Sequence, residues 1–185
     1  RLFEGMGAVV EEACIDLENA EETFQTLRAV QFVASYSDLL EHNREQLKPE
    51  VIWNIEKGYA LTAREIAEAE LARGALYHRA AQFFETHDIL ICPTVAVPPF
   101  DVDLRYVDEI NGVQMDNYMS WLLITFSISL TACPAISVPC GFTRSGLPVG
   151  LQIVGPRARE DLLLGAAALF EQAVGLAERV PMDPP

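Results

Sequence analysis

Residues 129–155, SLTACPAISVPCGFTRSGLPVGLQIVG, decide the fold of this chain. Within them, residues 135–138 and 149–154 form two apolar runs rich in β-branched side chains. The residues between the runs include three that bend a chain, namely Gly141, Gly146 and Pro148. This pattern predicts two buried strands joined by a short connection. Neither run alternates cleanly between apolar and polar residues, so we expect both faces of their sheet to be covered.

Helical spacing of apolar residues recurs on both sides of these strands. It predicts helices over residues 18–41, 50–57, 62–86, 116–130 and 162–177. We expect Gly58 to end the second helix, and Thr62 with Glu65 to form a capping box at the start of the third. Gly74 inside the third helix costs about 1 kcal/mol relative to alanine, so we expect a close helix contact there.

Shorter segments complete the predicted order of elements. Residues 88–92 are expected to form a buried strand, and residues 7–15 are a further strand candidate that acidic residues interrupt. Residues 95–114 carry prolines, aspartates and an Asn-Gly pair, which predicts a long irregular connection of the kind that is functional or mobile. Residues 181–185 are interpreted as a tail.

Composition and charge limit the classes of function. The 185 residues suffice for one domain with a core, and a net charge of −14 argues against nucleic acid and anionic membranes as partners. No apolar run approaches the ~20 residues that cross a membrane. The four cysteines are scattered without zinc-site spacing, so we expect reduced thiols, no metal or cofactor, and a cytoplasmic location. The chain starts at Arg1 rather than methionine, which we interpret as a processed product or a fragment.

Three motifs follow one another along the chain: DILICPT at residues 88–94, ACPAISVPCGF at residues 132–142 and GLPVGLQIVG at residues 146–155. Together with the closing helix they resemble the C-terminal portion of the amidase-signature family, and the resemblance covers nearly the whole chain. It implies an α/β fold, the C-terminal part of the amidase-signature fold, in which helices cover a mixed β-sheet. The expected domain is residues 1–185, without the N-terminal catalytic half.

The resemblance also implies a reaction. Family members hydrolyse carboxamides to a carboxylate and ammonia or an amine, using a serine nucleophile, a second serine in a cis peptide and a lysine base. Those residues belong to a Gly-Ser-rich stretch that this sequence lacks, and Lys48 and Lys57 are interpreted as helix-surface charges. We therefore expect no catalytic residue here, an inactive isolated chain, and the missing N-terminal half as its partner. The three histidines are expected on helix surfaces rather than beside a nucleophile: His42, His78 and His87.

The helix before the quoted stretch carries most of the candidate substrate-binding residues. Met119, Leu122 and Phe126 fall on one stripe at helical spacing, which fits either a core stripe or a pocket wall. The resemblance places this helix beside the substrate cavity, with Leu122 and Trp121 where glutamine-using members have an acid. It also places Thr94 at a strand end facing the cavity, where its hydroxyl either contacts substrate or caps backbone. An apolar pocket for a neutral small-molecule amide follows, since burying an ammonium there costs several kcal/mol.

Two alternatives remain beside this hypothesis. One is a glutamine amidotransferase subunit that feeds ammonia to a partner, but residues 51–61 lack the arginine that such members use to clamp a carboxylate. The other is a noncatalytic interaction or assembly domain, with a homodimer among its partner states. Ser129 and Ala132 also depart from the family pattern, which often has asparagine and glycine at these positions. Because alanine does not easily adopt positive φ, these changes leave the geometry of that loop open.

Overall fold

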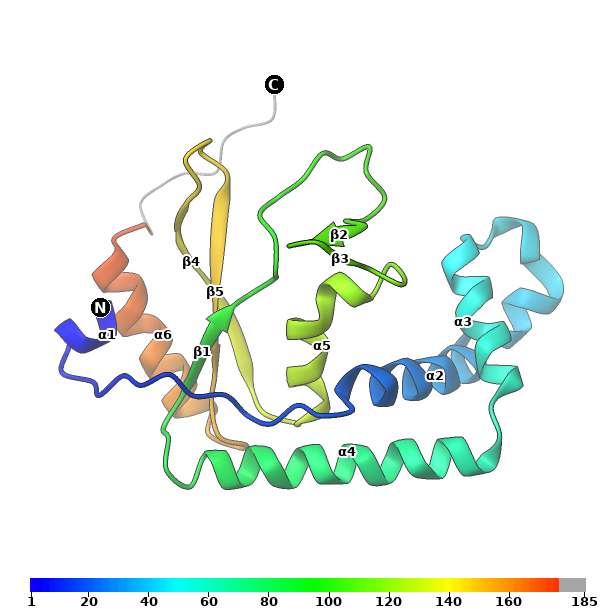
Figure 1. Cartoon of the computed structure of the whole chain (residues 1–185), viewed down its shortest axis with the longest axis horizontal. Helices are drawn as coiled ribbons and strands as arrows, with labels where there is room; N and C mark the ends of the chain where they lie inside the picture. Colours follow the sequence, from blue (N-terminus) through cyan, green and yellow to red (C-terminus); the bar gives the residue numbers. More distant parts are fainter. Residues whose placement is uncertain (177–185) are drawn as a thin grey trace. The chain divides into compact units, whose positions relative to one another are not determined.

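The structure is a computed structural model, which describes residues 1–176 (Figure 1). The chain forms two compact units, one from Asp16–His78 and the other from residues 1–15 together with the chain from Arg79 onward. Helices build the first unit, whereas the second contains a β-sheet. None of the helices within residues 1–176 is both long enough and apolar enough to cross a bilayer. The last predicted helix ends at Val174 rather than near Ala177, because Gly175 adopts a left-handed backbone conformation, and the predicted tail lies outside the described residues.

The first three predicted helices are present in the helical unit. It consists of α2 (Ala20–Asn43), a 3-10 turn (Arg44–Gln46), α3 (Pro49–Ala60) and most of α4 (Ala63–Phe83). The capping box forms at the start of α4, where the Thr62 N–H donates to Glu65 Oε2 at 2.7 Å. In return, the Glu65 N–H donates to Thr62 Oγ1 at 3.2 Å. Local side-chain chemistry therefore sets the start of α4, as the sequence predicted.

Two glycines of this unit act differently from the prediction. The helix α3 continues through Gly58 to Ala60, so Gly58 does not end it. Its role is close packing on α2, because a Cβ there would lie 2.5 Å from the Ala29 carbonyl oxygen and 2.5 Å from Val33 Cγ2. Gly74 has nothing within 4 Å of the position of a Cβ, so the predicted close helix contact is wrong.

The sheet of the second unit has the strand order β1-β5-β4, with both pairs antiparallel. Its strands are β1 (Leu90–Pro93), β4 (Ala135–Phe142) and β5 (Pro148–Val154). The predicted pair of strands is confirmed, and β4 extends beyond its apolar run through an irregularity between Pro139 and Gly141. Because β5 is central, β1 and β4 do not pair with each other, and this order positions the site described below.

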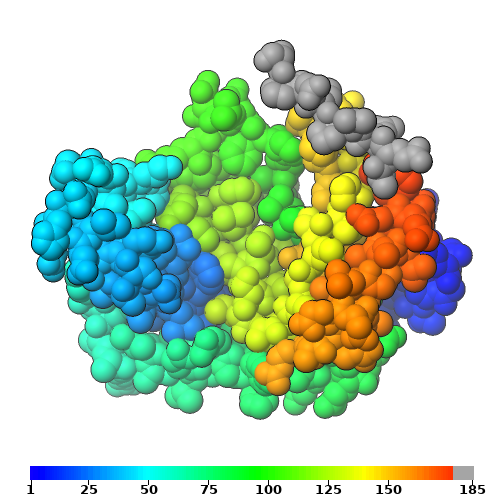
Figure 2. Space-filling view, turned by 180° about the vertical axis from the view of Figure 1, so that it is seen from behind, coloured from blue at the N-terminus to red at the C-terminus, as the bar shows by residue number. Residues whose placement is uncertain are grey.

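One face of the sheet carries the hydrophobic core. It packs against α6 (Glu160–Val174) and α1 (Leu2–Gly5), and Figure 2 shows α6, in orange to red, over yellow β4 with the blue N-terminal segment beside it. The rings of Phe3 and Phe170 stack with centroids 5.5 Å apart. The buried side chains of this core are Phe3, Val138, Ile153, Leu163, Ala167 and Phe170.

The opposite face is covered at one end only. There Val154 is fully buried and Gln152 is 6% exposed, whereas Ser137 and Pro139 on β4 are exposed. The expectation of two covered faces therefore holds at one end of the sheet and not along its length. The uncovered part is where small and polar residues alternate with the core-facing residues of β4.

Three further segments differ from prediction. Residues 7–15 are extended but form no strand, and Ile15 is the buried residue among them. The connection 95–114 holds a small hairpin, β2 (Glu109–Ile110) and β3 (Val113–Gln114). The helix predicted from residue 116 starts later, as a 3-10 turn η2 (Ser120–Leu122) followed by α5 (Leu123–Leu130). Asn117 Oδ1 accepts the Met119 N–H at 2.9 Å, and such local bonds compete with helix.

Candidate functional site

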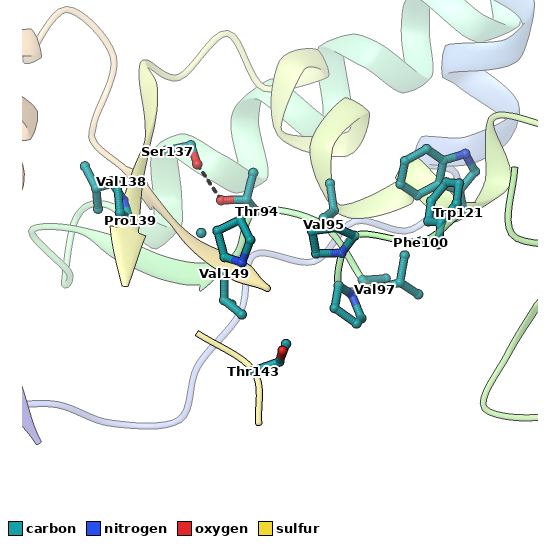
Figure 3. Close-up of a pocket in the computed structure, with 15 residues that line it drawn as sticks. Thr94, Val95, Val97, Phe100, Trp121, Ser137, Val138, Pro139, Thr143 and Val149 are labelled. Carbon is teal, nitrogen blue, oxygen red and sulfur yellow. Dashed lines mark hydrogen bonds between the residues drawn. The ribbon is translucent and has the colours of Figure 1, made fainter. Parts of the chain in front are cut away.

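A groove of about 690 Å³ lies over the sheet face opposite α6, within the sheet-containing unit (Figure 3). Three parts of the chain form it: the segment that follows β1, the 3-10 turn η2, and the hairpin of β4 and β5. Its lining consists of Thr94, Val95, Ala96, Val97, Pro98, Pro99, Phe100, Trp121, Ser137, Val138, Pro139, Thr143, Pro148, Val149 and Gly150. The groove therefore unites segments that are far apart in the sequence.

Thr94 is fixed at the floor of the groove by its backbone. Its N–H donates to the Gly150 carbonyl at 3.2 Å, which prolongs the pairing of β1 with β5 by one residue. Its carbonyl accepts the Thr125 hydroxyl from α5 at 3.0 Å. The Thr94 hydroxyl lies 2.7 Å from the Ser137 hydroxyl, so its partner is a side chain rather than the backbone cap considered from the sequence.

An aromatic pair forms the other end of the groove. The rings of Phe100 and Trp121 meet edge to face, with centroids 5.4 Å apart and an angle of 81° between their planes (Figure 3). Phe100 follows Pro98 and Pro99, whose rings restrict the backbone of this segment. The wall that carries the aromatic pair is therefore partly preorganised by covalent structure.

The groove is electrically neutral along its described lining, where no side chain is charged. Its polar groups are the indole N–H of Trp121 and the hydroxyls of Thr94, Ser137 and Thr143. The Thr143 hydroxyl lies 2.8 Å from the Ser145 hydroxyl and accepts the Leu147 N–H at 3.0 Å, so it serves the connection between the strands. An ammonium or carboxylate group in this groove would find no opposite charge among the lining residues.

The predicted substrate-binding residues divide into two groups. Thr94 and Trp121 line the groove, whereas Met119 and Phe126 are buried at 7% and 3% exposure and do not line it. Leu122 is half-buried and also lies outside the lining. The placement of Met119 and Phe126 fits the core stripe that helical spacing allowed as the alternative.

Several lining residues were not predicted. They are the segment 95–100 and the residues Ser137, Val138, Pro139, Thr143, Pro148, Val149 and Gly150 of the hairpin. For residues 95–100 a signal existed, because long irregular connections are often functional. For Ser137 and Gly150 the sequence carried no comparable signal, since their proximity depends on the order of the strands.

None of the three histidines lines the groove. His42 lies in α2 with Nδ1 2.8 Å from the Asp38 carbonyl oxygen. His87 was predicted on a helix, which is wrong, because α4 ends at Phe83. Its ring stacks on Phe83 with centroids 4.1 Å apart, and Nε2 lies 2.8 Å from Glu11 Oε1. The Thr86 hydroxyl lies 3.0 Å from His87 Nδ1, but neither residue belongs to the groove lining.

The lysines and cysteines likewise lie outside the groove lining. Burial lowers the pKa of Lys57, although the charges of Glu22 and Glu21 oppose this shift, and its ammonium lies 5.4 Å from the centre of the Trp53 ring. Burial raises the pKa of the Cys92 thiol, whose sulfur accepts a hydrogen bond from Gln152 Nε2 at 3.2 Å. All four cysteines are free, and no cluster able to hold a metal forms within residues 1–176.

The comparison with known proteins identifies the family of this chain. Residues 4–164 match the protein family described as Amidase, so the chain belongs to the amidase family. It is 31% identical to an acylamidase of Rhodococcus erythropolis over 98% of this chain and 38% of that protein. It is 37% identical to one subunit of the glutamyl-tRNA(Gln) amidotransferase from a Cyanothece species, over 53% of this chain and 19% of that protein. The chain thus spans about two fifths or less of the length of these relatives.

Solved structures confirm the predicted fold class. A bacterial aryl acylamidase of the amidase-signature family superimposes with a TM-score of 0.82 at 23% identity, over 98% of this chain and 41% of that one. The 6-aminohexanoate cyclic dimer hydrolase, solved with its substrate, gives a TM-score of 0.82 at 24% identity, over 97% and 40%. At these identities the likeness shows the fold alone, which is the α/β fold of amidase-signature enzymes.

Proposed function

We propose that this chain is part of an amidohydrolase that cleaves neutral carboxamides, and that it forms an apolar wall of the acyl pocket. The observation that carries the proposal is the lining of the groove, in which no charged side chain occurs among the described residues. A neutral acyl group loses little on leaving water for such a surface, whereas an ionised group loses its hydration without compensation. Family membership supports the reaction class, and the 31% identity to an acylamidase supports the kind of substrate.

In this proposal the roles of the residues follow from their placement. Trp121 and Phe100 hold the acyl group by apolar contact, and Thr94 lies beneath it at the end of β1. Met119, Leu122 and Phe126 remain predicted contributors, through packing behind the groove or through contact with substrate. The serine nucleophile, the second serine and the lysine base implied by the family resemblance come from residues outside this chain. Small amides are its ligands, and the catalytic half of the same protein is its partner.

A glutamine amidotransferase subunit is the second candidate, favoured by the 37% identity over about half of the chain. Free glutamine carries an ammonium and a carboxylate, and both require partners of opposite charge when they leave water. The described groove lining offers none. A noncatalytic assembly domain, a homodimer and a cytoplasmic location stay predictions.

The experiment compares the full-length protein with the isolated chain of residues 1–185. Each is assayed against p-nitroanilides of straight-chain acids, which release coloured p-nitroaniline on hydrolysis. We expect turnover by the full-length protein and none by the isolated chain. Absence of turnover by a folded full-length protein, across alkyl and aryl acyl groups, would contradict the proposed reaction. Turnover by the isolated chain would contradict the assignment of the catalytic groups to residues outside it.

A further inference from the structure

Two hydroxyl groups meet across the central strand of the sheet at the floor of the groove. Thr94 follows β1 and Ser137 belongs to β4, and these strands flank β5 on opposite sides. Neighbouring strands lie about 4.8 Å apart, so β1 and β4 are separated by about twice that distance. Nevertheless the hydroxyl oxygens of Thr94 and Ser137 lie 2.7 Å apart, and Figure 3 shows their bond within the groove. Both side chains therefore lean over β5 to reach each other.

The absence of a side chain at Gly150 makes this meeting possible. A Cβ at Gly150 would lie 2.7 Å from Thr94 Oγ1 and 3.0 Å from Ser137 Oγ. The φ angle of Gly150 is not in the left-handed region, so its backbone conformation does not require glycine. Glycine within a strand weakens it and often marks the close approach of another group. Here the approaching groups are the two hydroxyls.

The hydroxyl pair has hydrogen-bonding capacity to spare. Two hydroxyls hold two hydrogens and four lone pairs, and the bond between them uses one hydrogen and one lone pair. One hydrogen and three lone pairs remain, on side chains that line the groove. Gly150 and Thr125 hold the backbone of Thr94, and the bond to Ser137 holds its hydroxyl, so the two oxygens are positioned before any ligand arrives.

We infer that the Thr94–Ser137 hydroxyl pair over Gly150 is a neutral polar subsite, which selects amides whose acyl group carries an uncharged hydrogen-bonding oxygen. This inference rests on the proposed function and specifies its substrate class. An ether, hydroxyl or carbonyl oxygen accepts the remaining hydrogen, while the rest of the acyl group contacts the apolar wall. An ionised group is a poorer ligand, because the described lining has no charge to pair with it.

The test uses the full-length protein and two matched series of p-nitroanilides. One series carries straight alkyl acyl groups of increasing length, and the other replaces one methylene by an ether oxygen to give an ω-methoxy chain. The measured quantity is the ratio of kcat/KM for the ether over that for its alkyl match. We expect Ser137→Ala and Thr94→Val to lower this ratio about three- to tenfold at the best chain length, as the loss of one hydrogen bond predicts. Gly150→Ala should lower it as well, by displacing both hydroxyls.

Ser35→Ala is the matched control, since Ser35 is exposed on α2 and neither lines the groove nor bonds a residue that does. This variant should have the same ratio of kcat/KM, ether over alkyl substrate, as the unmodified protein. Ser137 is exposed, so its truncation leaves the core intact, and this variant decides the question if Gly150→Ala fails to fold. Ratios that agree within twofold in all variants, with turnover retained, would overturn the inference and leave the proposed function standing. No turnover of any p-nitroanilide by the full-length protein would overturn both.

Discussion

Ala132 adopts a left-handed backbone conformation, with φ of 57°, at the position where the family often has glycine. For a residue with a Cβ this conformation costs roughly 1–2 kcal/mol. The surrounding bonds hold it there: the Thr131 N–H donates to the Ile128 carbonyl at 3.0 Å, and the Gly155 N–H donates to the Pro134 carbonyl at 3.0 Å. The loop at Ala132 is therefore a left-handed turn, which answers the question about its geometry that the sequence left open.

Ala132→Gly should therefore stabilise the full-length protein, by up to about 1 kcal/mol in the free energy of unfolding. Relief of the strain exceeds the extra entropy that glycine brings to the unfolded chain. Chemical denaturation measures the difference. Ala135→Gly, three residues further on in β4, is the control and should destabilise, because strand conformation suits alanine. Destabilisation by both substitutions would contradict the claim of strain at Ala132.

Gly58 and Gly74 both lie within helices, but only Gly58 packs closely against another helix. Replacing each by alanine therefore distinguishes the effect of packing from that of helix propensity. Gly58→Ala should destabilise by about 1–3 kcal/mol, because the added methyl overlaps the Ala29 carbonyl and Val33 of α2. Gly74→Ala makes the same chemical change where nothing lies within 4 Å, and it should stabilise by about 1 kcal/mol. Thermal unfolding of the two variants gives the comparison. Effects of the same sign would show that the close contact between α2 and α3 is not what requires glycine.

The capping box of α4 predicts a dependence of stability on pH. Hydrogen bonds from the Thr62 hydroxyl and then from its N–H lower the pKa of Glu65 in the folded protein. Ionised Glu65 therefore stabilises the folded protein at pH values above its pKa in the unfolded chain, which is near 4.3. This stabilisation is lost as the pH falls through the lower pKa of the folded protein. Glu65→Gln should therefore lower the free energy of unfolding of the full-length protein at neutral pH. The variant should also lose less of this free energy than the unmodified protein when the pH falls below about 4. Glu85→Gln, beyond the helix end, is the control, and an identical acid response in both variants would refute the linkage.

Most helices and strands that depend on local sequence signals were predicted correctly, whereas features that depend on tertiary contacts were not. The β4–β5 pair and the start of α4 follow from local signals, namely apolar runs around Gly146 and the Thr62–Glu65 pattern. Gly58 was misjudged because its packing against Ala29 is a tertiary contact, which chain position does not reveal. The late start of α5 has a local cause, the hydrogen bond from the Met119 N–H to Asn117 Oδ1. This cause was missed, because the helical spacing of apolar residues from Met119 onward predicted an earlier start.

At the scale of the whole molecule, the groove could be predicted only in part. Thr94 and Trp121 were identified from the family resemblance, and the structure places both in the lining. Ser137 and Gly150 were missed, because their proximity to Thr94 requires the order β1-β5-β4. Each strand is visible in the sequence as an apolar run, but the order in which strands pair is a non-local property.

Trp121→Ala should lower kcat/KM of the full-length protein for an aryl-acyl p-nitroanilide about tenfold, through loss of apolar contact in the groove. The effect should appear mainly in KM, because the ring binds the acyl group rather than the reacting atoms. Trp53→Ala is a matched control, since this tryptophan belongs to the helical unit and does not line the groove. Equal losses in both variants would indicate a general effect on folding instead of a role in the pocket.

The neutrality of the groove is tested most directly by the substrate preference of the full-length protein. The measurement is kcat/KM for butanamide, which is glutamine without its two charged groups, against kcat/KM for L-glutamine, with the release of ammonia followed in both assays. Because the two charges of glutamine meet no partner in the described lining, the neutral amide should be preferred at least about 100-fold. Equal efficiency on the two substrates, or a preference for glutamine, would contradict an apolar acyl wall.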